Sequence, residues 1–264
     1  MMNFVEAIVL GIIQGLTEFL PISSSGHLEI GKALFGNEVL GQESLFLTLV
    51  LHFGTALSTM VVFRKEIGEI IKDLFQFSIN ENTLFSFKII ISMIPAGLVG
   101  LFLQDAIEAL FSKNLILVGA MLILTALILY LADRSKKTEK NVSFSNAFVL
   151  GIVQAVAILP GISRSGSTIA TAVLLGVDKE KAARFSFIMV LPLIMGSIAK
   201  TILDLEGVPH QTDSVALFLG FIAAFLSGIF ACQWMIAIVK KSKLKYFSYY
   251  CIIVGSLTLA YGLF

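Results

Sequence analysis

The sequence predicts an all-α polytopic membrane protein with six transmembrane helices and two re-entrant helical hairpins, arranged as an inverted-topology repeat. The composition is the first observation: of 264 residues, 57% are hydrophobic and 14% are charged, whereas soluble domains carry about 25% charged residues. Long apolar runs along the chain are the second. The third is a pair of shorter apolar runs with polar tips that resemble each other. We therefore expect one membrane domain over residues 1–264.

Six apolar runs are long enough to span a bilayer, which requires about 20 residues of helix. They are 45–63, 84–103, 115–132, 184–203, 214–239 and 246–263. Residues 65–77 look amphipathic, and we expect them to lie at the membrane surface. The net charge of +1 gives no bias toward nucleic acid.

Two further segments are too short to span and have polar turns. Residues 4–36 and 144–176 each contain a short apolar run, a proline, a turn rich in Ser and Gly, and a second short segment. Irregular backbone at membrane depth is tolerated only where protein covers it or where it lines a cavity. We expect both segments to be re-entrant hairpins.

These hairpins are copies of each other. A shift of 140 residues aligns 4–36 with 144–176 without a gap and gives 13 identities in 33 positions. Three spanning helices follow each hairpin, so the second copy should be inverted relative to the first. The repeats cover approximately 1–132 and 141–264, and such repeats place polar sites where they meet, near the midplane.

Basic residues predict the orientation through the positive-inside rule. Of the Lys and Arg residues in loops, 14 fall on one side, whereas Lys32 and Lys113 fall on the other. We expect the basic side to be cytoplasmic, with the first hairpin and a site open to the periplasmic side of the inner (plasma) membrane. The 14 are Arg64, Lys65, Lys72, Arg134, Lys136, Lys137, Lys140, Lys179, Lys181, Arg184, Lys240, Lys241, Lys243 and Lys245.

The second turn, "PGISRSGST" at 160–168, has the residues of an anion site. Ser163 is a good N-cap, and amides at a helix start attract phosphate. Arg164 adds a fork that can hold phosphate oxygens. A buried arginine needs a partner, so a purely structural pairing with a carboxylate is the alternative. The expected phosphate ligands from this turn are Ser163, Arg164, Ser165, Gly166, Ser167 and Thr168.

The first turn differs from the second at its reactive positions. Gln14 and Glu18 share a helical face, and His27 follows a run of serines. Histidine serves as nucleophile or general acid/base near neutral pH. Glu18 could orient it, act as a base or bind a cation. Simple helix capping is an equal alternative for the serines. The candidates from this turn are Gln14, Glu18, Ser23, Ser24, Ser25, Gly26 and His27, whereas His52 is expected to serve helix packing.

The two motifs together, "QGLTEFLPISSSGHL" and "PGISRSGSTIA", resemble the undecaprenyl-diphosphatase family of bacterial membrane proteins. The resemblance covers essentially the whole chain. It implies hydrolysis of undecaprenyl diphosphate to undecaprenyl phosphate and inorganic phosphate, which recycles the lipid carrier of cell-wall synthesis. It also implies a link to bacitracin resistance, a divalent cation (Mg²⁺ or Ca²⁺), and functional roles for Glu18, Ser24, His27 and Arg164.

One departure from the family pattern concerns Gln14, because many members carry glutamate at this position. An amide supplies no second carboxylate for a metal. Either Glu18 suffices, or the diphosphate itself supplies most of the metal ligands. Attack on phosphorus by His27 and by water both remain open.

A different class of function, a flippase for prenyl phosphates, is the main alternative, because inverted repeats are common in transporters. The unequal turns favour the enzyme. A homodimer is compatible with the sequence but is not predicted by any one feature.

Overall fold

A computed structural model describes residues 4–35, 42–76, 78–103, 114–204, 213–240 and 243–263, without the side chains of 42–45, 201, 202, 204 and 240. Lys113, Lys241 and Gly36 lie outside these ranges, and Lys240 is described only in its backbone. All regular structure in the described residues is helical. The helices are α1 (Phe4–Phe19), α2 (Ser24–Leu34), α3 (Gln42–Val62), α4 (Arg64–Phe75), α5 (Glu81–Phe102), α7 (Leu115–Asp133), α8 (Phe144–Val156), α9 (Arg164–Leu174), α10 (Lys179–Asp204), α11 (Ser214–Lys240) and α12 (Lys245–Leu263).

The expected membrane spans are present as long apolar helices. Within the described residues, α5, α7, α10, α11 and α12 are long and apolar enough to cross a bilayer. The pair α3 and α4 counts as a sixth span if it is taken together, and it bends by 79° at its break. The prediction of an all-α polytopic membrane protein is confirmed, and α4 is the expected amphipathic helix at 65–77.

Polar side chains start many of these helices. Ser143, Asn80 and Asn114 each accept a hydrogen bond from a backbone N–H of the first turn, at 3.1, 2.9 and 2.9 Å. The turns of the two short pairs use the same device at Ser23 and Ser163. A side-chain oxygen at the N-cap satisfies an N–H group that has no partner inside the helix.

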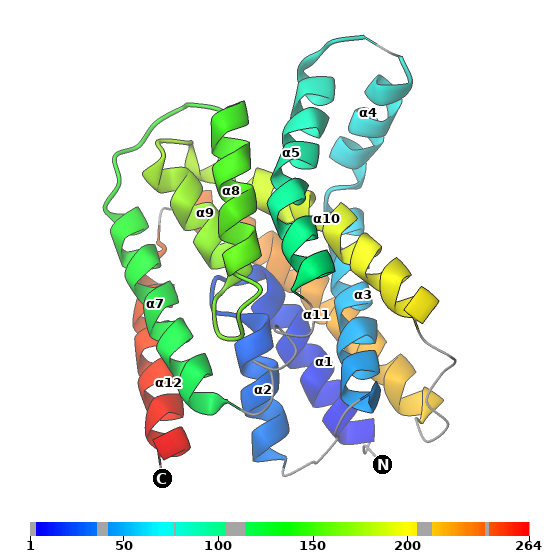
Figure 1. Cartoon of the computed structure of the whole chain (residues 1–264), viewed down its shortest axis with the longest axis vertical. Helices are drawn as coiled ribbons and strands as arrows, with labels where there is room; N and C mark the ends of the chain where they lie inside the picture. Colours follow the sequence, from blue (N-terminus) through cyan, green and yellow to red (C-terminus); the bar gives the residue numbers. More distant parts are fainter. Residues whose placement is uncertain are drawn as a thin grey trace.

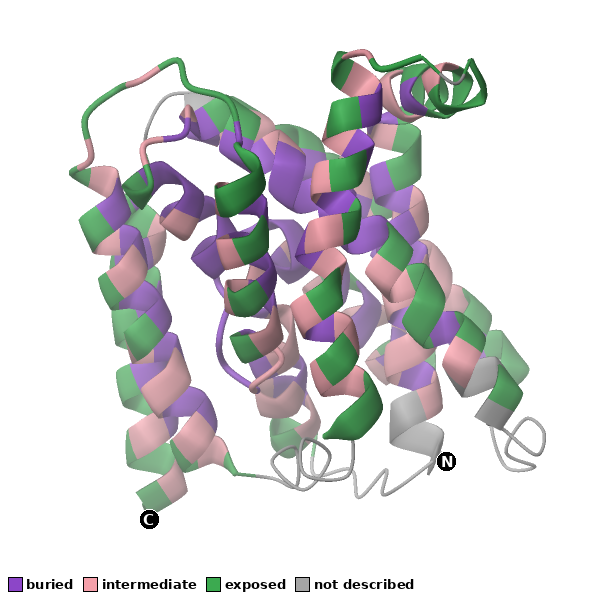
Figure 2. Ribbon diagram, turned by 45° about the horizontal axis from the view of Figure 1, so that its top comes forward, coloured by how far each residue is buried: buried purple, intermediate pink, exposed green. Residues whose placement is uncertain are grey.

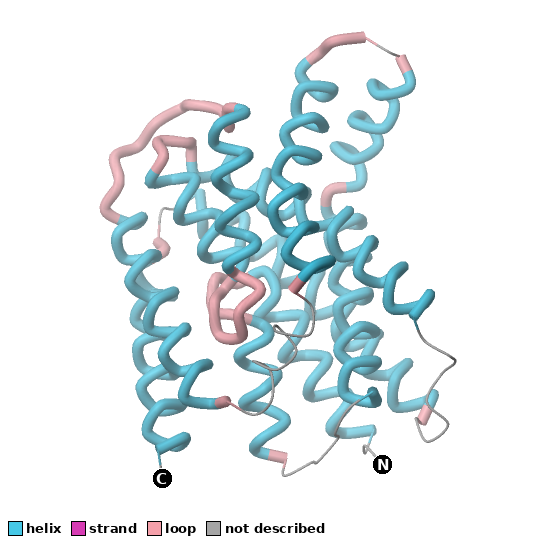
Figure 3. Tube along the Cα trace, in the orientation of Figure 1, coloured by secondary structure: helices cyan, strands magenta, loops and turns pink. Residues whose placement is uncertain are grey.

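Both expected hairpins form as pairs of short helices, α1 with α2 and α8 with α9 (Figure 1). The helix α2 runs from the middle of the molecule toward the end that holds both termini, whereas α8 runs to the middle from the opposite end. The turn between α8 and α9 consequently lies deep in the bundle rather than at an end (Figure 3). Their re-entrant placement in a bilayer and the inverted repeat stay predictions.

The most closely packed helix pairs join the first half of the chain to the second half. Helix α11 packs against α1, and α5 packs against α8, while α7 packs against α12. A Cβ on Gly11 would lie 2.3 Å from the Gly220 carbonyl oxygen, and one on its repeat twin Gly151 would lie 2.5 Å from that of Ser92. Both contacts therefore require glycine, because no Cβ fits at such distances.

Burial separates the centre of the bundle from its periphery (Figure 2). The turns and the facing sides of α7, α9 and α10 are buried, including Leu122, Ile169 and Phe185. Large apolar side chains cover the outer faces of the long helices, as expected for contact with lipid. Examples are Phe87, Ile90, Ile94, Leu98, Phe218, Ile253 and Leu257.

Candidate functional site

The two hairpin turns meet in the middle of the molecule. A Cβ on Gly26 would lie 3.2 Å from Gly161 Cα, and one on Gly166 would lie 3.1 Å from Pro21 Cβ. Each helix-start glycine thus abuts the tip of the other hairpin. Ser165 Oγ also donates a hydrogen bond of 3.3 Å to the Leu20 carbonyl oxygen. The structure therefore brings both sequence motifs, 146 positions apart at Glu18 and Arg164, into one site.

Helices α7 and α12 fix the depth of these turns. Thr125 Oγ1 on α7 accepts a hydrogen bond of 3.0 Å from the Ser163 amide. Cys251 on α12 lies with its Sγ 3.7 Å from the Pro21 carbonyl oxygen. Ser248 Oγ links α12 to α7 by donating to the Ala126 carbonyl oxygen at 2.7 Å. The irregular backbone of both turns is thereby bonded inside protein, as a low-dielectric setting requires.

Glu18 is the centre of the polar network. Its Oε2 accepts hydrogen bonds from Ser24 Oγ at 2.7 Å and from Gln14 Nε2 at 2.9 Å. Its Oε1 forms an ion pair with the Arg164 guanidinium from the other hairpin. The carboxylate side chain is only 5% exposed. A buried carboxylate is tolerated when it is paired and hydrogen-bonded in this way, and the pairing considered above for Arg164 is present.

His52 on α3 lies beside this network, although its sequence context suggested helix packing. Its Nδ1 lies 2.8 Å from the Thr48 carbonyl oxygen, which can only accept, so Nδ1 is the donor. Its Nε2 lies 3.8 Å from Glu18 Oε2. The signal in the sequence was an ionisable residue inside a spanning run, but its direction along α3 could not be read.

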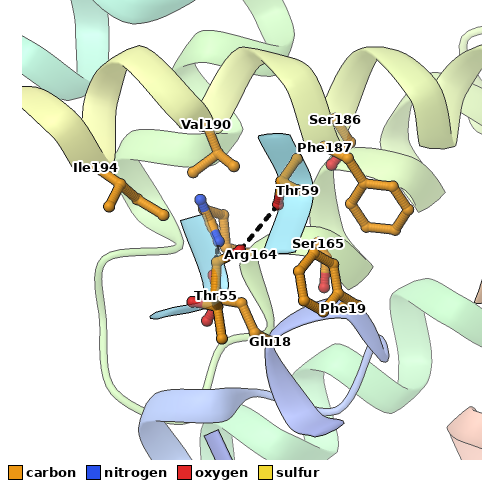
Figure 4. Close-up of a pocket in the computed structure, with 10 residues that line it drawn as sticks. All are labelled: Glu18, Phe19, Thr55, Thr59, Arg164, Ser165, Ser186, Phe187, Val190 and Ile194. Atoms are coloured by element: carbon orange, nitrogen blue, oxygen red, sulfur yellow. Dashed lines mark hydrogen bonds and ion pairs between the residues drawn. The ribbon is translucent and has the colours of Figure 1, made fainter. Parts of the chain in front are cut away.

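A small pocket opens at Glu18 and Arg164 between α1, α3, α9 and α10 (Figure 4). Hydroxyl groups line part of it, and apolar side chains including Val190 and Ile194 on α10 line the rest. The lining residues are Glu18, Phe19, Thr55, Thr59, Arg164, Ser165, Ser186, Phe187, Val190 and Ile194. The pocket therefore places the Arg164 guanidinium and several hydroxyl groups beside an apolar wall.

His27 faces away from this pocket, toward α12. Its ring hydrogen bonds to the Ser23 carbonyl oxygen through Nδ1 and to the Tyr250 hydroxyl through Nε2, both at 2.8 Å. Among the interactions of the described residues, no hydrogen bond joins His27 to Glu18. Glu18 thus does not orient His27 through a hydrogen bond in this part of the chain, and the role of His27 stays a prediction.

The remaining predicted ligands divide into engaged and unengaged groups. Ser23 and Ser163 accept from the amides of Gly26 and Gly166 at 3.2 and 3.1 Å, which is the capping role. Ser25 Oγ lies 3.4 Å from Ser23 Oγ. Thr168 Oγ1 lies 2.6 Å from Ser186 Oγ, whereas Ser167 Oγ and Gln14 Oε1 are buried without a hydrogen-bond partner among the described residues.

The donor set limits how this site could hold a cation. Within the described residues, no three His, Cys, Asp or Glu side chains gather as ligands. Glu18 is the one carboxylate of the pocket, but Gln14 Oε1 is an orphaned oxygen beside it. Mg²⁺ and Ca²⁺ prefer oxygen ligands. These two side chains fit a cation that brings its other oxygen ligands with a phosphate.

Almost the whole chain matches one known family. Residues 7–257 match the family model described as "Bacitracin resistance protein BacA". The chain belongs to this family. Both hairpins, and therefore Glu18 and Arg164, lie inside the matched BacA region apart from the first residues of α1.

Individual BacA relatives match equally completely. A protein named undecaprenyl-diphosphatase from Christiangramia forsetii is 61% identical over 254 residues, covering 96% of each chain. One of the same name from Bacteroides fragilis is 51% identical, covering 98% of each chain. A third from Methanobrevibacter smithii is 39% identical over 96% of each chain. The resemblance read from the two motifs is confirmed.

Proposed function

We propose that this chain is an undecaprenyl-diphosphatase: it hydrolyses undecaprenyl diphosphate to undecaprenyl phosphate and inorganic phosphate. The relatives named above carry this activity in their names. The observation that carries the proposal is the Glu18–Arg164 pair, built across two hairpins at a buried pocket. The product is the lipid carrier of cell-wall polymers, and the family description links the activity to bacitracin resistance.

The pocket suits a molecule with a charged head and an apolar tail. The Arg164 guanidinium faces the head-group side with donors, beside the hydroxyls of Thr55 and Thr59. Val190 and Ile194 on α10 offer an apolar wall. A diphosphate can therefore be held by charge and hydrogen bonds while its prenyl chain stays in the bilayer.

Arg164 gains a second partner during binding. Without substrate, Glu18 neutralises its charge. An incoming phosphate oxygen offers the guanidinium a second anionic partner, and the planar fork has donors enough for both. Phosphoryl transfer depends chiefly on positioning and on neutralising charge that spreads over the phosphate oxygens. Arg164 supplies that charge.

Ser24 is the best-placed nucleophile. Its hydroxyl donates to Glu18 Oε2 at 2.7 Å, which is the arrangement of a nucleophile beside its base. In this step Ser24 Oγ bonds to the terminal phosphorus, its proton passes to Glu18, and the bond to the bridging oxygen breaks to release undecaprenyl phosphate. Water then hydrolyses the phosphoserine and yields inorganic phosphate. Direct attack by water or by His27 are the competing routes.

A divalent cation is part of this proposal. Glu18 and the Gln14 amide oxygen would hold it together with oxygens of the diphosphate. When bound, Mg²⁺ or Ca²⁺ neutralises negative charge on the phosphates. Arg164 still binds the phosphate oxygens, and Glu18 still accepts the proton of Ser24.

The protein is a multi-pass membrane protein, and we place it in the inner (plasma) membrane of a bacterium. The basic end of the bundle, which carries α4 and the loop between α7 and α8, would face the cytoplasm. The first hairpin then enters from the periplasmic side. The flippase alternative is not proposed, because no comparison favours it.

The first test is phosphate release from undecaprenyl diphosphate by purified protein in detergent, with Mg²⁺, with Ca²⁺ and with chelator. Arg164→Ala and Glu18→Gln should each lower kcat/KM by about 10²- to 10³-fold, because each removes charge at the phosphates. Arg134→Ala and Glu29→Gln, which change the same residue types outside the pocket, serve as controls. Unchanged turnover in both pocket variants would refute the site.

A further inference from the structure

Tyr250 on α12 joins His27 across the two halves of the chain. Its hydroxyl lies 2.8 Å from His27 Nε2, across a sequence separation of 223 residues. The two rings also stack, with centroids 5.6 Å apart and an angle of 14° between their planes. No part of the assigned site includes Tyr250, and the proposed chemistry does not use it.

The hydrogen-bond partners define the state of the imidazole. The Ser23 carbonyl oxygen can only accept, so Nδ1 of His27 carries the hydrogen. In the neutral ring Nε2 is then the acceptor, and the Tyr250 hydroxyl is its donor. His27 is thus held at both nitrogens, once by its own helix and once by the opposite half.

The setting strengthens this contact. Tyr250 is 40% exposed on the outer side of α12, next to lipid-facing residues. A phenol hydroxyl beside hydrocarbon finds no water to bond, so a protein acceptor matters more there than in an aqueous loop. Tyr249, its neighbour in sequence, is similarly exposed and has no hydrogen bond to the site among the described residues.

We propose that Tyr250 is a positioning residue for His27: together with the Ser23 carbonyl oxygen, it fixes the plane and the tautomer of the imidazole and holds Nε2 toward α12. The proposal rests on the proposed function for its effect on turnover, but not for the contact itself. The ring stack limits rotation of the imidazole, and the hydroxyl selects the nitrogen that has no hydrogen.

Nitrogen NMR tests the contact without any substrate. The chain has three histidines, so protein labelled with ¹⁵N-histidine gives few ring signals, and His27→Gln assigns those of His27. Tyr250→Phe keeps the stack but removes the donor, so the Nε2 signal of His27 should shift while that of His52 stays. Tyr249→Phe, the matched control, should shift neither. Unmoved His27 signals in Tyr250→Phe would overturn the proposal.

Kinetics test the consequence. Tyr250→Phe should lower kcat about three- to tenfold, the effect of one hydrogen bond, with KM within about twofold. Tyr250→Leu, which also loses the stack, should lower it further. In a His27→Gln background Tyr250→Phe should change nothing more, because it acts through His27. An undiminished effect in that background, or a change in KM alone, would refute positioning.

These two readouts separate the failures. If wild-type protein released no phosphate but the NMR shift appeared, the proposed function would be refuted and the contact between Tyr250 and His27 would be supported. If turnover were normal and the shift absent, the positioning role alone would fall. Equal melting temperatures for Tyr250→Phe and wild type show that the variant is folded.

Discussion

At the scale of single residues, the two hairpins differ at the positions that carry ionisable side chains. Gln14 finds a hydrogen-bond acceptor four residues later in Glu18. Its repeat twin Gln154 has Ile158 at that distance, and both polar atoms of the buried Gln154 amide lack a partner among the described residues. The same shift places Arg164 opposite Ser24. Each turn thus supplies groups that the other lacks.

Replacing Ser24 tests the proposed nucleophile. Ser24→Ala removes the hydroxyl bonded to Glu18, so kcat should fall by about 10²- to 10⁴-fold and acid-quenched enzyme should hold no phosphate from substrate labelled at its terminal phosphorus. Ser25→Ala is the control, because its hydroxyl has Ser23 Oγ, at 3.4 Å, as its one hydrogen-bond partner among the described residues. Full turnover of Ser24→Ala would leave water or His27 as the nucleophile.

At the scale of helices, paired glycines decide how closely the halves approach. Gly151 lets α8 touch the backbone of α5 at Ser92, as Gly11 lets α1 touch α11. These contacts bring the hairpin arms against the long helices, and so they set where the turns meet.

Gly151→Ala should therefore destabilise the fold. The added Cβ would lie 2.5 Å from the Ser92 carbonyl oxygen, so the free energy of unfolding should fall by about 1–3 kcal/mol. Gly97→Ala on α5 adds the same atom where nothing lies within 4 Å, and it should be neutral or gain up to about 1 kcal/mol. Thermal unfolding in detergent compares the two, and equal midpoints would contradict the packing argument.

At the scale of the whole molecule, the sequence predicted the positions of the helices better than it predicted which side chains contact each other between them. The apolar runs located the long helices, and the prolines and serines located both turns, because these signals are local. It also identified Glu18, Ser24 and Arg164, which the structure brings together. It did not identify the contacts of His52 and Tyr250, because the direction of a side chain and a contact across 223 residues depend on tertiary packing.

Topology in the membrane gives a prediction at this scale. Both termini lie at the end opposite α4 (Figure 1), so Phe4→Cys should react with an impermeant maleimide applied outside intact cells. Ser135→Cys, in the loop between α7 and α8, should react only after the membrane is opened. Wild type is a low-background control because Cys232 and Cys251 are buried. The reverse labelling would invert the orientation.

The ion pair between Glu18 and Arg164 has an evolutionary consequence. Two identical copies of one hairpin would always carry the same residue at equivalent positions, so a mutation in one would appear in the other. Within a single chain, the codons for positions 18 and 158, or 24 and 164, can diverge independently. An acid from one copy and a base from the other can then face each other, a specialisation open to a fused duplicate and closed to a symmetric dimer.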